Sequence, residues 1–179
     1  MMPGSDPGHS SLIPMAIGNT WTYVDSLLTD STTSVDTFTV SIMNDRIDSQ
    51  HLWWEFHDSR IQGTFLIELA MRNDSVFSLQ SNEDSSVISL EYIPPPETDT
   101  LRYVSIFDGK APVEKSVFLL EGSCPVPAGT FDRCAVYSWL ESPLGFIEIL
   151  KPGVGMVRTQ FSTSTGEHRI SLLQYAIAE

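Results

Sequence analysis

The segment from His51 to His57, HLWWEFH, holds the most concentrated set of side chains that could do chemistry. As a strand it places His51, Trp53, Glu55 and His57 on one face, because successive side chains of a strand alternate. Glu55 and His57 would lie about 7 Å apart at Cα and could share a metal ion, but two ligands do not make a site. We therefore interpret the segment as a strand with an aromatic core face and a polar face, and expect no metal or other cofactor.

The sequence carries none of several common catalytic or phosphate-binding motifs. The sequence contains no Gly-x-Ser-x-Gly nucleophile motif, no Walker phosphate loop, no Gly-x-Gly-x-x-Gly and no His-Glu-x-x-His. We therefore expect a protein that is not an enzyme. The alternative is a hydrolase whose residues meet only in space, with a serine or a carboxylate pair beside His51, His57 or His168.

Two acidic turns, at residues 44–48 and 82–84, carry the carboxylate oxygens that calcium prefers. Neither turn matches an EF-hand loop. We interpret both as solvated hairpin ends that help to keep the chain soluble.

Cys124 and Cys134 flank a segment rich in proline and glycine and lie equally far from Gly129. If Ala128 and Gly129 form the tip of a hairpin, the two cysteines fall across the ladder from each other, where a disulfide is geometrically feasible. We favour this bridge if the protein is exported. The alternative is two buried thiols that act as small apolar groups.

The elements that must position these residues are strands, because apolar residues alternate with period two and no long helical periodicity occurs. Turn signals punctuate the strand patterns at short intervals, and Asn73-Asp74 predicts a tight hairpin between residues 64–72 and 75–80. We expect ten to twelve short strands, with Pro94 to Pro96 in an extended loop, since proline cannot donate to a ladder. The clearest alternating runs are residues 34–44, 64–72, 101–107 and 169–176.

Composition sets the class of the protein. The 179 residues include 41% hydrophobic residues, enough for a substantial core in one domain. The net charge of −13 disfavours nucleic acid as a partner, and no apolar run is long enough to span a bilayer. Residues 1–11 lack the apolar stretch of a secretory signal, so we expect a flexible leader followed by a single all-β domain over residues 12–179.

Four motifs resemble those of exported bacterial proteins and lipoproteins of uncharacterised function. Residues 13–23, IPMAIGNTWTY, resemble their P-L-x-x-G-N-x-W-x-Y opening, with Met15 where leucine is usual. Residues 126–131, VPAGTF, resemble their V-P-A-G-T-F turn, which precedes a strand with a cysteine, here Cys134. Residues 151–158, KPGVGMVR, and 172–175, LLQY, are similar to two of their later strands, and the order matches from Ile13 to Tyr175.

The resemblance implies a location in the cell envelope, periplasmic or at the surface, and a curved antiparallel sheet. It implies no catalytic residue. A signal sequence or a lipid anchor would then belong to a segment outside this sequence.

We predict an all-β fold made of one strongly curved antiparallel sheet, a half-barrel or incomplete barrel, with a two-sheet β-sandwich as the alternative. A curved sheet must bury its concave face or hold something there. We therefore predict a non-enzymatic envelope or secreted domain that binds an apolar or amphipathic ligand, such as a lipid, on that face. The alternative is a cell-surface interaction module that docks an envelope protein through a sheet edge or an aromatic patch. The expected ligand-binding residues are Trp53, Trp54, Glu55, His57 and Trp139.

Overall fold

The structure, a computed structural model, describes residues 11–48, 51–61, 67–81, 86–107, 111–140 and 145–178. These residues form strands and connecting turns. The strands are β1 (Thr20–Leu28), β2 (Thr33–Ile47), β3 (Leu52–Asp58), β4 (Ile67–Arg72), β5 (Ser75–Ser81), β6 (Ser86–Tyr92), β7 (Leu101–Phe107), β8 (Ala111–Leu119), β9 (Ser123–Val126), β10 (Gly129–Asp132), β11 (Ala135–Trp139), β12 (Ile147–Lys151), β13 (Gly155–Thr163) and β14 (Gly166–Ala176).

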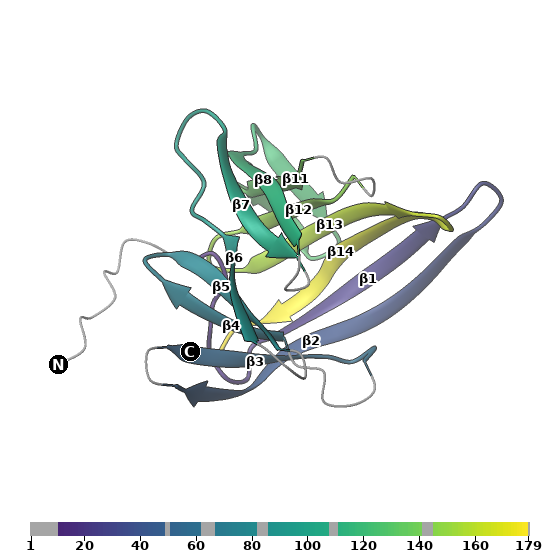
Figure 1. Ribbon diagram of the computed structural model, residues 1–179. Coiled ribbons are helices and arrows are strands. Elements are labelled where there is room, and N and C mark those ends of the chain that lie inside the picture. Colours follow the sequence, from purple (N-terminus) through teal and green to yellow (C-terminus); the bar gives the residue numbers. More distant parts are fainter. Residues whose placement is uncertain are drawn as a thin grey trace.

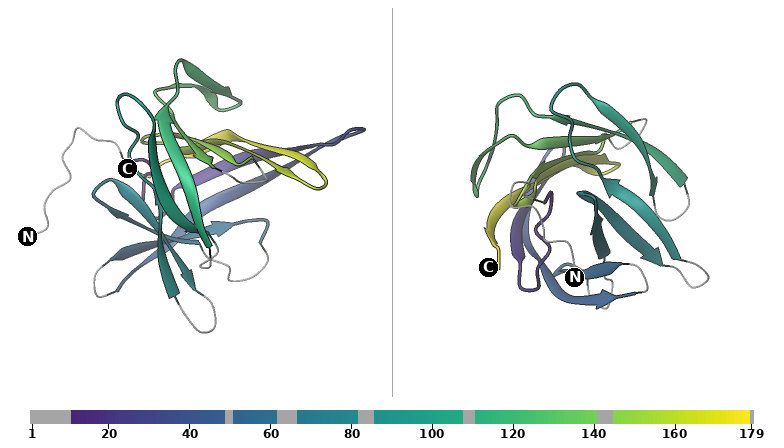
Figure 2. Two further views of the ribbon diagram at one scale, coloured as in Figure 1. Left: turned by 45° about the horizontal axis from the view of Figure 1, so that its top comes forward. Right: turned by 90° about the vertical axis from the view of Figure 1, so that its left-hand side faces the viewer.

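Twelve of these strands form one antiparallel sheet in the order β6-β5-β4-β3-β2-β1-β14-β13-β12-β11-β8-β7, and β9 pairs with β10 alone. The sheet curls until its edge strands, β6 and β7, lie side by side, so that the right-hand view of Figure 2 shows a ring (Figures 1 and 2). The prediction of an all-β, strongly curved incomplete barrel is confirmed, and the β-sandwich alternative is wrong. Among the described residues, no helix is long and apolar enough to cross a membrane.

The hairpin predicted at Asn73 and Asp74 joins β4 to β5. Both residues have positive φ, 49° and 61°, as a type I′ turn requires, and Arg72 pairs with Ser75 across it. Asparagine and aspartate tolerate this conformation better than other residues with a side chain, which explains why this turn was readable from the sequence.

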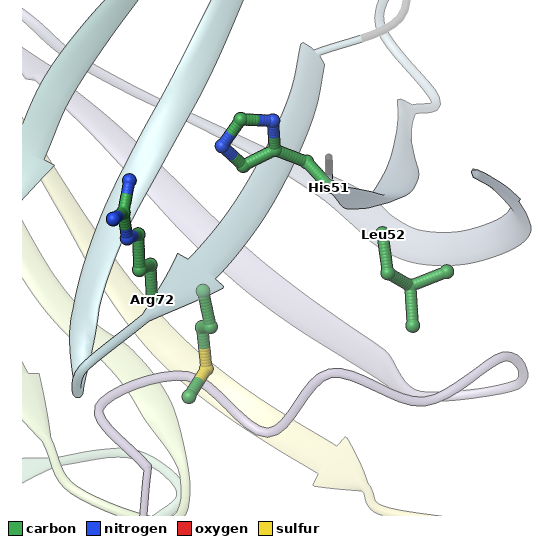
Figure 3. Close-up of a pocket in the computed structure, with 4 residues that line it drawn as sticks. His51, Leu52 and Arg72 are labelled. Carbon is green, nitrogen blue, oxygen red and sulfur yellow. The ribbon is translucent and has the colours of Figure 1, made fainter. Parts of the chain in front are cut away.

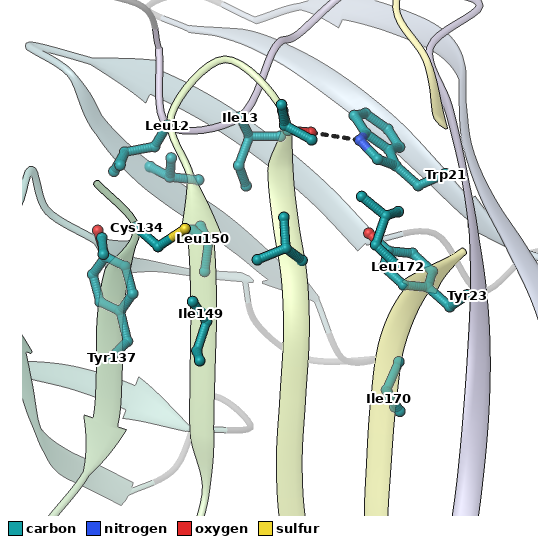
Figure 4. Packing of buried hydrophobic residues seen from close by; sticks show 14 of the residues in the cluster. Leu12, Ile13, Trp21, Tyr23, Cys134, Tyr137, Ile149, Leu150, Ile170 and Leu172 are labelled. Carbon is teal, nitrogen blue, oxygen red and sulfur yellow. Dashed lines mark hydrogen bonds between the residues drawn. The ribbon is translucent and has the colours of Figure 1, made fainter. Parts of the chain in front are cut away.

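The residues of the opening motif tie the start of the described chain to the sheet. Asn19 is fully buried; its Nδ2 donates to the Pro14 carbonyl and its Oδ1 accepts from the backbone N–H of Ala178, both at 2.7 Å. Trp21 Nε1 donates to the carbonyl of Val154 at 2.6 Å (Figure 4). This motif therefore has a structural role. Of the expected leader, residues 1–10 lie outside the described residues, and the Ser11 carbonyl accepts from the backbone N–H of Gly153.

The hydrophobic core covers one face of the sheet, which we call the inner face. Trp21, Tyr23, Leu150 and Leu172 define this face, and none is more than 3% exposed (Figure 4). Residues that lie opposite each other on neighbouring antiparallel strands share a face, so the register assigns further residues to it.

The β9–β10 hairpin corrects the expected position of the two cysteines. Gly129 pairs with Val126, so the turn lies one residue earlier than expected and Cys124 lies opposite Phe131. The expectation that Cys124 and Cys134 face each other across this ladder is therefore wrong. Both thiols are free and buried in this structure, and a bridge between them stays a prediction.

The two edge strands meet along a seam, which we define as the junction of β6 with β7. The strands share no ladder, although they are consecutive in the chain. Instead, the hydroxyl of Ser89 on β6 accepts from the Ile106 N–H at 2.9 Å, donates to the Ile106 carbonyl at 3.0 Å and lies 3.2 Å from the Ser105 hydroxyl. Side-chain contacts such as these thus stand where a backbone ladder would otherwise join the two strands.

Candidate functional site

Two neighbouring cross-strand rows of the inner face carry most of its polar and aromatic side chains. The first row runs through Tyr137, Glu148, Thr159, Ile170 and Asp25. The second row, two residues away along each strand, runs through Tyr103, Lys115, Trp139, Phe146, Phe161 and His168.

Lys115 of β8 is the centre of a buried polar cluster, which also contains Glu91, Tyr92, Tyr103, Tyr137 and Glu148. The Lys115 side chain is 2% exposed, and its Nζ donates to Glu91 Oε2 at 2.9 Å. The other oxygen of Glu91 accepts from the Ser78 hydroxyl at 2.7 Å. The ammonium also lies 5.0 Å from the ring centroid of Trp139 and 5.6 Å from that of Tyr92. These partners compensate for the loss of water around the buried charge.

Glu148 of β12 is the second buried carboxyl group of the cluster. Its Oε1 accepts from the Tyr92 hydroxyl at 3.0 Å. Burial raises the pKa of Glu148, while the charge of Lys115 and the hydrogen bond from Tyr92 act in the opposite direction. The inner face therefore carries a carboxyl group that protonates more readily than an exposed glutamate.

The tyrosines of the cluster donate hydrogen bonds to the end of β6 and the residue that follows it. The Tyr103 hydroxyl donates to the Glu91 carbonyl at 2.7 Å, and the Tyr137 hydroxyl donates to the Ile93 carbonyl at 2.6 Å. Burial raises the pKa of Tyr92, Tyr103 and Tyr137, so all three hydroxyls keep their protons at neutral pH.

Beside the polar cluster, four rings stack on one another across neighbouring strands. We call these rings, those of Trp139, Phe146, Phe161 and His168, the aromatic row. The centroids of Trp139 and Phe146 are 4.6 Å apart, those of Phe146 and Phe161 are 5.2 Å apart, and those of Phe161 and His168 are 4.8 Å apart. All four side chains are only half-buried. The inner face therefore keeps an apolar strip that solvent can reach.

Charged groups end the aromatic row on the side away from Lys115. His168 Nδ1 lies 3.2 Å from Asp25 Oδ1, and Arg60 approaches Asp25 Oδ2 to 3.6 Å. Arg60 also donates to Asp58 and stacks on the Phe38 ring. The aromatic row is thus an apolar strip with Lys115 near one end and the Asp25, His168 and Arg60 side chains near the other.

The structure divides the five residues predicted to bind a ligand between the two faces of the sheet. Trp54 packs against the core cluster, and Trp139 belongs to the aromatic row, so both lie on the inner face. Trp53, Glu55 and His57 alternate with Trp54 along β3 and lie on the opposite face. They do not form one site with Trp139.

The turn before β3 has a structural role that its acidic residues do not suggest. The carboxylate of Asp48 accepts from the His51 backbone N–H at 2.8 Å and from Nε1 of the completely buried Trp53 at 2.7 Å. Residues 82–84, the other acidic turn, lie outside the described residues. Within the described ranges, no group of three or more His, Cys, Asp or Glu residues could hold a metal ion.

A pocket of about 530 Å³ opens beside this turn (Figure 3). It is lined by His51 and Leu52 at the start of β3 and by Met71 and Arg72 at the end of β4. The imidazole of His51 lies 3.7 Å from Asp48. The pocket is separate from the aromatic row, because no residue of that row lines it.

Sequence reasoning missed the polar cluster, because its residues come from β6, β7, β8, β11 and β12. One signal was present. Lysine occurs only at positions 110, 115 and 151, and Lys115 stands between Val113 and Val117 on the apolar side of an alternating run. A lysine at an inward position needs buried partners, which would have pointed to the cluster.

No family model matches the sequence, and no curated protein matches it. The fold is similar to that of two solved structures. One is a candidate lipoprotein from Parabacteroides distasonis, with 14% identity, a TM-score of 0.53 and coverage of 94% of this chain and 99% of that chain. The other is a candidate exported protein with a YmcC-like fold from Bacteroides fragilis, with 13% identity, a TM-score of 0.50 and coverage of 93% and 99%. At these identities the similarity concerns the fold alone.

Proposed function

We propose that this chain is a non-enzymatic protein of the cell envelope that binds an apolar or amphipathic ligand, such as a lipid, on the inner face of its sheet. The observation that carries the proposal is the aromatic row, because its rings lie on the concave side yet stay partly exposed. A filled barrel interior would bury such rings completely. Burial of an aromatic side chain by a ligand contributes about 1.5–3 kcal/mol.

The location rests on the two similar structures and on the motifs of the sequence. Both solved proteins are candidates for export or lipid anchoring. Cell fractionation of the full-length protein tests this part directly. Recovery in the cytosolic fraction would contradict it.

Native mass spectrometry tests ligand binding without a prior guess of the ligand. The protein is purified without detergent, and its native mass is compared with its mass after denaturation. We expect a species of lipid size that is released when the protein unfolds. A ligand-free native mass, with no uptake from a mixture of membrane lipids, would contradict the proposal.

A variant locates the ligand on the inner face. Phe161→Ala removes one of the two middle rings of the aromatic row, and Tyr175→Ala removes a ring that is 41% exposed and lies outside that row. With the fluorescent fatty acid cis-parinaric acid, we expect Phe161→Ala to weaken binding about tenfold or more, from the apolar area lost. Tyr175→Ala should leave binding unchanged. Unfolding curves of both variants show whether each is folded under the conditions of the binding assay.

A second candidate function is the docking of an envelope protein. Ile47 and Leu52 are opposite each other on β2 and β3, and they are 77% and 37% exposed beside the pocket of His51 and Arg72. Exposed apolar pairs of this kind occur at interaction sites. Cross-linking in intact envelopes with the wild-type protein and with Ile47→Asp tests this function; a partner captured equally by both would contradict it.

A further inference from the structure

The seam between β6 and β7 is closed by side chains, and these contacts join β6 to four other strands. Ser89 holds the backbone of Ile106 on β7, and Tyr103 of β7 donates to the Glu91 carbonyl. The remaining contacts, from Lys115, Tyr137 and Glu148, reach the end of β6 from β8, β11 and β12. The polar cluster of the inner face therefore also holds the two edges of the seam together.

A seam held by side-chain contacts opens more easily than two strands joined by a backbone ladder. A ladder loses backbone hydrogen bonds along its whole length, whereas the described parts of β6 and β7 have no ladder to lose. The Lys115–Glu91 ion pair contributes little net free energy to closure of the seam, because both charged groups are hydrated again when the seam opens. Hydroxyl groups such as those of Ser89 and Ser105 also exchange their partners for water at small net cost.

The two sides of the seam differ in polarity. Ser89 and Ser105, which are 1% and 2% exposed, face each other within it. The alternate residues Ile88 and Val104 point the other way and are 47% and 59% exposed. The edges thus present apolar side chains outside and polar groups inside, an order that suits an acyl chain on its way to a polar cluster.

We propose that the β6–β7 seam opens in solution and is the route by which an amphipathic molecule with an acyl chain reaches the inner face. This inference rests on the proposed ligand-binding function. In this inference the polar cluster has a second role, because its contacts must break before the seam opens. The ligand is then a molecule with a long apolar chain and a polar head.

Thiol labelling tests the opening without any ligand. Ser105→Cys places a thiol in the seam, and Ser116→Cys places one in the β8–β11 ladder at a similar exposure, 2% against 5%. Both variants are made in a Cys124→Ala/Cys134→Ala background. They are also made in the wild-type chain, because its two native thiols are buried. We expect iodoacetamide to label Ser105→Cys about tenfold faster or more than Ser116→Cys, since local opening exposes weakly held segments first. Equal rates would overturn the proposal.

A reversible cross-link tests the route. The Ser89 and Ser105 hydroxyl oxygens are 3.2 Å apart, so Ser89→Cys/Ser105→Cys can form a disulfide that locks the seam. Ser116→Cys/Ser138→Cys is the matched control, because these hydroxyl oxygens are 2.7 Å apart within a paired ladder. We expect oxidation to slow the uptake of cis-parinaric acid about tenfold or more in the seam variant, with recovery after reduction. The ladder variant should show no change.

The outcomes separate this inference from the function on which it rests. Equal uptake by the oxidised and reduced seam variant would overturn the route and leave the ligand-binding function standing. Failure of every variant and of the wild type to take up cis-parinaric acid or membrane lipids would overturn the function and the route with it. If the disulfide does not form, the labelling rates decide whether the seam opens.

Discussion

Trp21 and Val154 are 133 residues apart in the chain, and the indole N–H of one donates to the backbone carbonyl of the other at 2.6 Å. The contact joins the opening motif to the motif at residues 151–158, two of the motifs in the resemblance to exported proteins. It fastens the start of β1 to the turn between β12 and β13. These motifs therefore encode one junction of the fold.

Loss of this hydrogen bond should destabilise the protein measurably. Trp21→Phe leaves the buried Val154 carbonyl without its donor, which should cost about 1–2 kcal/mol in the free energy of unfolding, and the void left by the smaller ring adds to this loss. Urea unfolding followed by circular dichroism measures it. Tyr175→Phe, at an exposed position, is the control and should change stability very little. Equal stability of Trp21→Phe and the wild type would show that the bond contributes nothing.

The turn of the β13–β14 hairpin leaves no room for a side chain. A Cβ added at Gly166 would collide with the backbone carbonyl of Leu28, at the end of β1. Gly129 has a similar φ, +143° against +149°, and nothing near its Cβ position. We expect Gly166→Ala to cost about 1–3 kcal/mol more than Gly129→Ala, from overpacking alone. Thermal unfolding of the two variants measures the difference. Equal melting temperatures would mean that the β13–β14 turn can move away from Leu28 at no cost.

The buried carboxyl of Glu148 should make stability depend on pH. Its folded pKa lies above the ordinary 4.5, so the folded protein holds the proton after the unfolded chain has lost it. This contribution to stability is complete below pH 4.5 and is lost as the pH rises through the folded pKa. Glu148→Gln keeps an acceptor for Tyr92 and removes the titration.

We therefore expect Glu148→Gln to gain stability relative to the wild type as the pH rises above 4.5. Urea unfolding over a series of pH values measures the difference. Glu121→Gln, at an exposed position, is the control and should show no such trend. A pH-independent difference for Glu148→Gln would show that the carboxyl group titrates alike in the folded and unfolded states.

The two cysteines offer a test of compartment as well as of structure. Burial raises the pKa of Cys134 to about 11, so the free thiols should react slowly with alkylating reagents while the protein is folded. In protein recovered from an oxidising compartment we expect a disulfide between Cys124 and Cys134, which would contribute about 2–3 kcal/mol. Intact mass after unfolding and alkylation without reductant decides the matter. Two added alkyl groups would contradict the bridge.

Local patterns in the sequence predicted the strands and the Asn73-Asp74 hairpin, because alternation and turn chemistry act over a few residues. The β-hairpin register near Gly129 was misplaced by one residue, since both Ala128 and Gly129 are suited to a turn. The polar cluster could not be assembled in the same way. Lys115 and Glu148 lie close together within one half of the sheet, but Glu91 and Tyr92 of β6 reach them only when the sheet closes along the seam.

The order of strands in the sheet has a consequence for how the chain folds. Apart from β1 with β14, every neighbouring pair joins strands that are consecutive in the chain or separated only by the β9–β10 hairpin. The chain is thus two meanders, residues 20–92 and 101–176, and within the described ranges the ladder between them is that of β1 with β14, at the middle of the sheet. Each meander can form from local contacts, so the closing of the β1–β14 ladder is the step with the largest loss of chain entropy. A circular permutant opened within residues 93–100 would turn the whole sheet into a single meander and should fold faster.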